Sequence, residues 1–306
     1  MTRPPPRILN RWSVPLPFHF QRGDKSAERA VRRIAAERLE TSRLLFDDTT
    51  LARETLVHEL RKNVKKARAL LRLVRPHFKG FERENAALRD AARLISDLRD
   101  ADVLGANLTR IAEKTDSPAD RIAALHARLA PAVTTAFTPE DRLNAHREAI
   151  AAVEGRIGKW KISGDGFEAL RPGLERSWDA ARSAMRKALS DPSGEALHLW
   201  RKRVKDHWYH TRLLAPVWPE MMTPHRATAD ALGETLGNAR DLAFLVEALT
   251  EGDLGNDADT AALARIAAEE EAALMKEARK TGTLFFAEPA SGLSRRWRGW
   301  WDIWRN

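Results

Sequence analysis

Hydrophobic positions between Val57 and Pro76 recur every three or four residues, which is the spacing of one face of an α-helix. The apolar or small residues of this narrow seam are Val57, Leu60, Val64, Ala67, Leu71 and Val74. Each is followed by a cation or a histidine, in the order His58, Arg61, Lys65, Arg68, Arg72 and Arg75. One residue turns a helix by about 100°, so these side chains form a basic stripe beside the seam. We expect Lys62 and Lys66 to widen this stripe.

The same pattern returns 140 residues later, between Leu197 and Pro216. The identical pairs are His58/His198, Arg61/Arg201, Lys62/Lys202, Val64/Val204, Lys65/Lys205, Arg72/Arg212, Leu73/Leu213 and Pro76/Pro216. An internal repeat of this kind indicates two similar structural units. We therefore predict that the two basic stripes face one shared site.

The positive charge of the chain is concentrated in these two segments. The whole sequence carries +9, whereas residues 57–76 carry +6 and residues 197–216 carry +4. The rest of the chain therefore sums to about −1. Clustered charge of one sign attracts ions of the opposite sign, so this distribution indicates a binding site for a polyanion.

Other patterns along the sequence argue against several classes of protein. The chain has no cysteine, which excludes disulfides and thiolate chemistry. It has no run of 18 apolar residues and no secretory h-region near its first residues, so we expect a cytoplasmic protein without a membrane span. It also lacks an H-E-x-x-H motif, a phosphate-binding glycine loop, and a nucleophile with an adjacent base. We expect no catalytic residue, no metal and no cofactor.

Helical periodicity and turn signals divide the chain into an arm and two units. Residues 1–23 are rich in proline and arginine and predict an extended N-terminal arm. The first unit spans 24–160, with helices expected over 24–46, 57–76, 82–108, 119–135 and 138–160. The second unit spans 161–306, with helices expected over 167–189, 197–216, 223–251, 258–280 and 289–304. Residues 158–166 form the linker between them, and the absence of period-2 strands predicts an all-α fold built from bundles.

Four segments of the chain resemble one known family. They are VHELRKNVKKARALLRLVRP, ENAALRDAARLISDLRDADVL, HLWRKRVKDHWYHTRLLAPVWP and GNARDLAFL. Together they are similar to the CHAD domain, named for conserved histidines in an α-helical domain, over about residues 24–304. The resemblance implies two pseudo-symmetric four-helix bundles with a basic cavity between them. It also implies non-enzymatic binding of inorganic polyphosphate and association with polyphosphate granules.

Many relatives in this family carry a CYTH domain that hydrolyses triphosphates and is marked by an ExExK strand. No such segment precedes residue 24 in this sequence, so we expect no phosphohydrolase activity. An accessory role beside an enzyme that acts on phosphate polymers stays open.

The stripes and the resemblance together name candidate ligands for polyphosphate. They are His58, Arg61, Lys62, Lys65, Lys66, Arg68, Arg72, His198, Arg201, Lys202, Lys205 and Arg212. Weaker candidates are Arg33, Arg89, Arg182, Arg186, Arg99 and Arg240, of which the last two could instead form salt bridges with the aspartates that follow them. Arginine binds phosphate through two planar donors and lysine as a point charge.

The second stripe is the less basic of the two. Asp206, Trp208 and Ala215 stand where the first stripe has Lys66, Arg68 and Arg75, although Arg203, His207 and His210 lie close in the sequence. Nucleic acid is an alternative ligand, because a basic groove does not by itself distinguish one phosphate polymer from another.

A tryptophan-rich segment ends the chain, with Trp297, Trp300, Trp301 and Trp304 on one helical face. Packing of these rings against the bundle is the preferred interpretation, and contact with a membrane or granule surface is the alternative.

Overall fold

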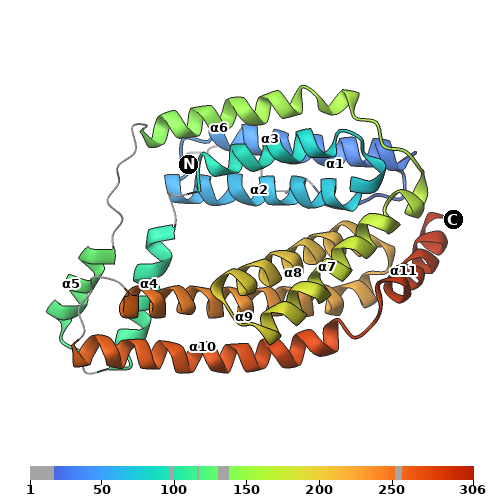
Figure 1. The fold of residues 1–306 in the computed structure, drawn as a ribbon. Helices are drawn as coiled ribbons and strands as arrows, with labels where there is room; N and C mark the ends of the chain where they lie inside the picture. Colours follow the sequence, from blue (N-terminus) through green and yellow to red (C-terminus); the bar gives the residue numbers. More distant parts are fainter. Residues whose placement is uncertain (1–16, 97–99, 116, 130–137, 252–256) are drawn as a thin grey trace, which may run out of the picture.

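The computed structural model describes residues 17–96, 100–115, 117–129, 138–251 and 257–306 (Figure 1). The helices of the first half are α1 (Ala27–Phe46), α2 (Arg53–Leu73), α3 (Phe81–Arg93), α4 (Asp100–Ala112), α5 (Ala119–Leu129) and α6 (Pro139–Glu154). Those of the second half are α7 (Arg171–Ser190), α8 (Gly194–Leu214), α9 (Pro219–Glu251), α10 (Ala258–Phe285) and α11 (Ala290–Arg305). Within these ranges the only strand-like pairing is one bridge between Phe78 and Ile162, so the all-α prediction is confirmed.

Four helices of the first half form the upper layer in Figure 1. Helices α1, α2, α3 and α6 pack in a ring, each against two of the others. The hydroxyl of Ser26 caps α1 by accepting a hydrogen bond from the N–H of Arg29. Thr138 and Asp141 form a capping box at the start of α6, and Pro139 takes its first position. Helices α1 and α6 thus begin three residues and one residue after the starts expected from the sequence, residues 24 and 138.

The second half forms the lower layer in Figure 1. Helix α8 packs between α7 and α9, α10 runs beside α9, and α11 covers the end of α7. The largest apolar core extends through both layers and includes Ile34 and Leu71 from the first half and Leu174 and Trp200 from the second. The two halves therefore share one continuous core.

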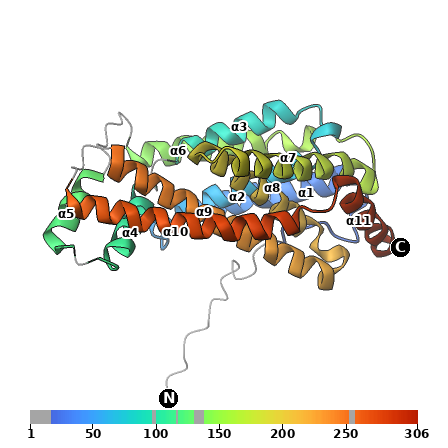
Figure 2. The ribbon, with the colours of Figure 1, turned by 60° about the horizontal axis from the view of Figure 1, so that its bottom comes forward.

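Helices α4 and α5 belong to the first half of the sequence but pack on the second half. They lie at the end of α9 and α10 that is distant from α11 (Figure 2). A separate apolar cluster joins them there, through Leu108, Ile111 and Leu125 on one side and residues such as Leu242 and Leu263 on the other. Arg110 strengthens this contact through an ion pair of 2.6 Å with Glu270 of α10.

The prediction of a single helix over residues 82–108 is wrong, because the structure divides this range into α3 and α4. Helix α3 ends at Arg93, and Ile95 turns into a small core beside Val57 and Leu60 of α2. Helix α4 instead packs against α9. The two parts bury their apolar faces against different layers, and a single straight helix could not do both. The second half has one continuous helix, α9, at the corresponding place.

The two ends of the described chain meet beside α11. Residues 1–16 of the predicted N-terminal arm lie outside the described residues, and Phe18 and Phe20 are buried. Arg305 of α11 donates hydrogen bonds to the backbone oxygens of Arg22 and Asp24, each at 2.7 Å. This anchors the segment after the arm to the last helix.

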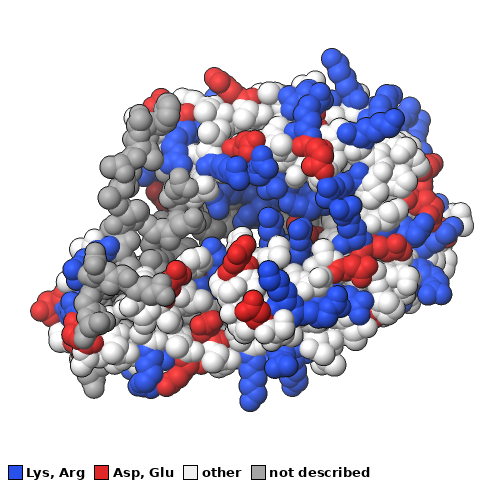
Figure 3. All heavy atoms as spheres, in the orientation of Figure 1, with Lys and Arg blue, Asp and Glu red and all other residues white. Residues whose placement is uncertain are grey.

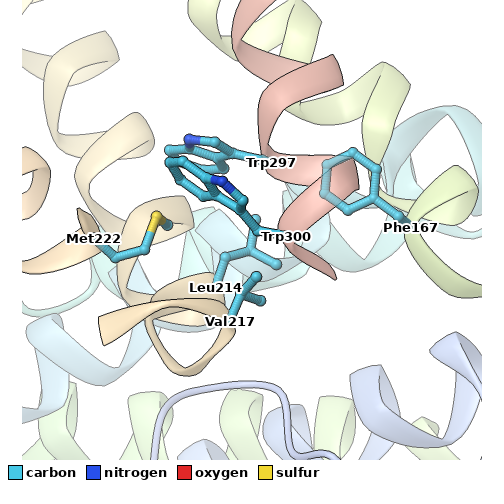
Figure 4. Close-up of a pocket in the computed structure, with 6 residues that line it drawn as sticks. All are labelled: Phe167, Leu214, Val217, Met222, Trp297 and Trp300. Carbon is cyan, nitrogen blue, oxygen red and sulfur yellow. The ribbon is translucent and has the colours of Figure 1, made fainter. Parts of the chain in front are cut away.

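The tryptophans of α11 face the core, as the preferred interpretation predicts. Trp297 and Trp301 are buried, while Trp300 and Trp304 are partly buried against the same cluster. A small apolar pocket lies beside them, too narrow to admit a water molecule (Figure 4). Its lining is Phe167, Leu214, Val217, Met222, Trp297 and Trp300. No helix in the described residues is long and apolar enough to cross a bilayer.

The two layers come close together where α7 crosses the end of α2. A Cβ atom placed on Gly173 would lie 1.8 Å from the backbone oxygen of Leu73 and 2.9 Å from that of Arg72. These are backbone atoms, which cannot move aside as a flexible side chain could. Gly173 is therefore required for the contact between the halves at this point.

We predict that Gly173→Ala lowers the free energy of unfolding by at least about 1–3 kcal/mol, because the methyl group forces α7 away from α2. Gly299→Ala is the matched control, since Gly299 lies within α11 with open space around it. That control should raise stability by up to about 1 kcal/mol through helix propensity. Chemical denaturation measures both, and unchanged stability of Gly173→Ala would contradict the close approach.

Candidate anion-binding site

The two stripe helices, α2 and α8, touch each other near their C-terminal ends. Arg72 of α2 donates to Asp206 of α8 at 2.8 Å, and these side chains are only 17% and 7% exposed. His210 of α8 donates through Nε2 to the backbone oxygen of Ala69 at 2.9 Å. Later residues of α2 therefore contact earlier residues of α8, as in an antiparallel pair of helices. The two helices cross in opposite directions, with their basic stripes extending away from a common centre.

Helix α2 is buried on more of its circumference than one narrow seam predicts. All six seam residues are buried, and so are Asn63, Ala69, Leu70 and Leu73. Of these additional positions, Ala69 meets His210 of α8 and Leu73 meets Gly173 of α7, on the side of α2 away from the seam. The basic stripe runs along the boundary between buried and open surface, so its cations are partly desolvated.

Cations of both helices gather around the carboxylate of Asp206. Arg72 contacts one of its oxygens, and Arg203 contacts the other at 3.4 Å. Arg68 lies close by, and burial followed by the charge of Arg72 lowers its pKa to about 10. Burial and then the charge of Arg72 also lower the pKa of Lys202. We call Arg68, Arg72, Lys202, Arg203 and Asp206 the central cluster.

A second group of cations lies on the other side of the Ala69–His210 contact. Lys66 is only 7% exposed and faces Arg38 of α1 and Arg212 of α8. Burial is the main cause that lowers the pKa of Lys66 to about 8, and the charges of Arg38, Arg212 and Lys62 lower it further. Burial also lowers the pKa of Arg38 and of Arg212. We call Lys66, Arg38 and Arg212 the lateral cluster.

The lateral cluster departs from the stripe expected from the sequence. Lys66 stands two residues before Arg68, which is about 200° of helix turn, so it faces a different side of α2. It therefore does not widen the stripe at Arg68. Arg38 was not a candidate, although it sits one turn after Ile34 in the apolar seam of α1 and is only 2% exposed. An arginine at the helical spacing of the buried residues is the sequence signal that could have identified Arg38.

The outer part of the second stripe is held against α9. Lys205 forms ion pairs with Asp230 at 2.9 Å and with Glu234 at 2.6 Å. Arg201 donates to the backbone oxygen of Gly233 at 3.3 Å. A Cβ atom on Gly233 would lie 2.9 Å from the side chain of Lys205, so the glycine makes room for that lysine. The patterns in the sequence do not predict a role for these α9 residues.

The outer part of the first stripe is more open. His58 and Lys65 are exposed, and Lys62 forms an ion pair of 2.9 Å with Glu59. Arg61 donates to the backbone oxygen of Ile95 at 3.4 Å. His198, at the corresponding end of the second stripe, is exposed too, and its pKa is lowered by partial burial and then by Arg240. Both histidines thus mark the outer ends of the stripes.

Most of the weaker candidates take part in local ion pairs. Arg33 pairs with Asp24 and Glu37 and donates to the backbone oxygen of His19, which ties α1 to the preceding loop. The remaining pairs are Arg89 with Asp90, Arg182 with Asp179, and Arg240 with Asp241. Arg186 is exposed on α7, and Arg99 lies outside the described residues.

His207 and His210, which lie close to the second stripe in the sequence, do not add positive charge to it. His210 is fully buried, and burial lowers its pKa to about 4. His207 is also fully buried, within a cage of Trp178, Trp297 and Phe285, and its Nε2 lies 2.8 Å from that of His225. Burial lowers the pKa of His207 well below its usual value. These rings are neutral near pH 7 and serve packing.

The face seen in Figure 3 is hollowed between the two layers, and Lys and Arg side chains gather around that hollow. Acidic side chains are fewer there and stand mostly at its edges. Among the described residues, no group of three or more His, Asp or Glu side chains is placed to hold a metal ion. The arrangement can bind and orient an anion through charge-assisted hydrogen bonds.

The fold and the site define a class of protein: all-helical, with cations clustered on two repeated helices. The sequence profile of the CHAD domain matches residues 33–250, which is well over half of the chain and includes both stripes. The chain belongs to the CHAD domain family, which is associated with polyphosphate binding. A search of curated proteins finds no match.

We predict that Asp206→Asn lowers the free energy of unfolding by about 1–3 kcal/mol, because the cations of the central cluster lose the acid between them. Added phosphate should restore part of this loss by replacing the missing charge. Glu82→Gln is the control, since Glu82 pairs with Arg75 while 75% exposed, and should cost less than about 1 kcal/mol. Equal effects in thermal unfolding would show that Asp206 does not neutralise the cluster.

Proposed function

We propose that this protein binds inorganic polyphosphate, without chemical reaction, in a basic cavity between two pseudo-symmetric four-helix units. The units are residues 24–160 and 161–306, and the cavity is the hollow of Figure 3. The observation that carries the proposal is the crossing of α2 and α8, which joins two basic stripes end to end. Membership of the CHAD domain family supports it.

The length of the joined stripes suits a linear polymer better than a compact anion. His58 lies 11 residues before Ala69, which is about 16 Å along α2, and His198 lies 12 residues before His210, about 18 Å along α8. The helices run in opposite directions, so these two distances add along the crossing. Polyphosphate carries one negative charge per internal phosphate at intervals of a few ångströms, and cations along both helices can match it.

Nucleic acid is the second candidate, and the aromatic side chains of α8 favour it less. Tyr209 is buried, and Trp208 is covered by Lys205 and Arg212, whose charged groups lie 4.8 and 4.9 Å from its ring. Burial prevents a base from stacking on Tyr209, and a base on Trp208 would compete with these two cations for the ring. Phosphate groups rather than bases are therefore the ligand chemistry that α8 presents.

We further propose that the protein is cytoplasmic. It could bind polyphosphate at the surface of polyphosphate granules, or it could act as an accessory to an enzyme that uses polyphosphate. The fixed cations neutralise phosphate charge, and no residue is assigned a part in breaking a phosphoanhydride bond. Binding would therefore hold or deliver the polymer intact.

We predict no release of phosphate from long polyphosphate with Mg²⁺ or Mn²⁺ present, measured by a colorimetric phosphate assay and by gel mobility of the polymer. Steady release that disappears with a point substitution in this chain, such as Arg72→Met, would show catalysis and overturn this part of the proposal.

We also predict that the two stripes contribute unequally to binding. Arg61→Gln with Lys65→Gln should weaken binding of long polyphosphate by roughly 10- to 100-fold, as expected for two lost charge-assisted contacts. Arg201→Gln with Lys205→Gln should weaken it less, since Asp230 and Glu234 already neutralise Lys205. Titration at several salt concentrations measures both, and affinity should fall steeply with salt.

Competition with RNA and DNA at fixed salt separates the two candidate functions. Polyphosphate should displace either nucleic acid at equal phosphate concentration. Tighter binding of RNA or DNA, or affinity that does not depend on salt, would contradict the proposed function.

A further inference from the structure

Two contacts between α2 and α8 are equivalent under the sequence repeat but differ in charge. A shift of 140 residues takes Arg72 to Arg212 and Lys66 to Asp206. Arg72 meets Asp206 in one contact, whereas Arg212 lies beside Lys66 in the other. An acid thus neutralises the arginine on one side of the crossing, and a second cation takes that place on the other.

Lys66 has no acid of its own in the described structure. It is more than nine-tenths buried, and its ammonium group makes no hydrogen bond or ion pair with any described residue. The charged groups that face it are Arg38 from α1, Arg212 from α8, and Glu59 and Lys62 from its own helix. Glu59 is bound to Lys62 at 2.9 Å, so the one nearby carboxylate is already neutralised.

Arg212 also lacks a neutralising partner among the described residues. Its guanidinium lies over the ring of Trp208 at 4.9 Å and near that of Phe18 at 5.8 Å. The charged groups of α9 that face it are Arg226 and Asp230, and Asp230 is held by Lys205 at 2.9 Å. Lys66 and Arg212 therefore combine burial with positive charge that no described carboxylate pairs with directly, which is costly for the protein without an anion.

We propose that Lys66 and Arg212, with Arg38 beside them, form a discrete subsite for a phosphate oxyanion. The subsite rests on the proposed function in that a phosphate of the polymer is one source of the anion. Free pyrophosphate is another source with the same chemistry. The anion lies between Lys66 and Arg212 and supplies the negative charge that Asp206 supplies to Arg72 at the equivalent contact.

Binding at this subsite is coupled to protonation of Lys66. The pKa of Lys66 is about 8, mainly because of burial, so about half of these side chains are neutral at pH 8. A bound phosphate stabilises the ammonium form and raises this pKa. The contribution of Lys66 to binding is therefore complete below pH 8, and it is lost as pH rises through the higher pKa of the bound state.

The test is calorimetric titration of the full chain with pyrophosphate at pH 8, in two buffers of different ionisation enthalpy. The unmodified protein should take up about half a proton more per bound anion than Lys66→Met, because any change in the protonation of pyrophosphate itself is shared by both proteins. Lys66→Met should also bind about tenfold more weakly, as expected when a charged contact is lost. Lys161→Met is the matched control, because Lys161 is 84% exposed and remote from the cluster, and it should behave like the unmodified protein.

Thermal unfolding gives a second measurement on the same variants. Lys66→Met should be more stable than the unmodified protein without phosphate, since it removes a buried unpaired charge, and it should gain less from added pyrophosphate. Equal affinity, equal proton uptake and equal stabilisation by pyrophosphate in the two proteins would overturn the subsite.

Long polyphosphate, titrated in the same way, distinguishes the subsite from the proposed function. Binding of pyrophosphate that depends on Lys66, with no binding of the long polymer, would support the subsite and overturn the proposed function. Binding of the long polymer with no effect of Lys66→Met on affinity or proton uptake would support the proposed function and overturn the subsite.

Discussion

The arrangement of the site depends on one physical constraint, which is that two strongly basic helices must touch. Like charges repel, and burial removes the water that would screen them. The crossing of α2 and α8 meets this constraint in three ways. Asp206 places an acid among the cations of the central cluster, His210 makes a neutral hydrogen bond to Ala69, and Gly173 lets α7 press on the end of α2. The cations that stay unbalanced are those able to attract an anion.

The asymmetry between the repeats follows from the same constraint. If both equivalent positions were lysine, the crossing would hold two buried like-charge pairs, and if both were aspartate it would neutralise both arginines. Lys66 on one side and Asp206 on the other keep the helices together while leaving net positive charge. In the outer part of the second stripe, Asp230 and Glu234 of α9 likewise neutralise Lys205. The second repeat thus contributes more to holding the structure, and the first has more open cations.

Much of the helical layout could be predicted from local signals, because caps and turn residues act over a few positions. Ser26, Thr138 and Pro139 mark helix starts correctly, and the seam of α2 is buried throughout. The break between α3 and α4 could not be predicted, since it depends on which layer each part meets. Equally, the direction of Lys66 and the depth of Arg38 depend on how α1 and α8 lie against α2. The burial of His207 depends on Trp178, Phe285 and Trp297 of three other helices, and His210 is held by its contact with Ala69 of α2.

The packing of α4 and α5 on the second half of the protein affects how the chain folds during synthesis and whether its two repeats can be separated. These helices are synthesised before α9 and α10, yet the apolar cluster that contains Leu108, Ile111 and Leu125 is completed by residues of those later helices. A nascent chain that has emerged as far as α6 would therefore carry an uncovered apolar surface until the second half is complete. Fragments cut at the linker between the repeats would expose this surface permanently, so genetic separation of the repeats would yield aggregation-prone pieces rather than two independent modules.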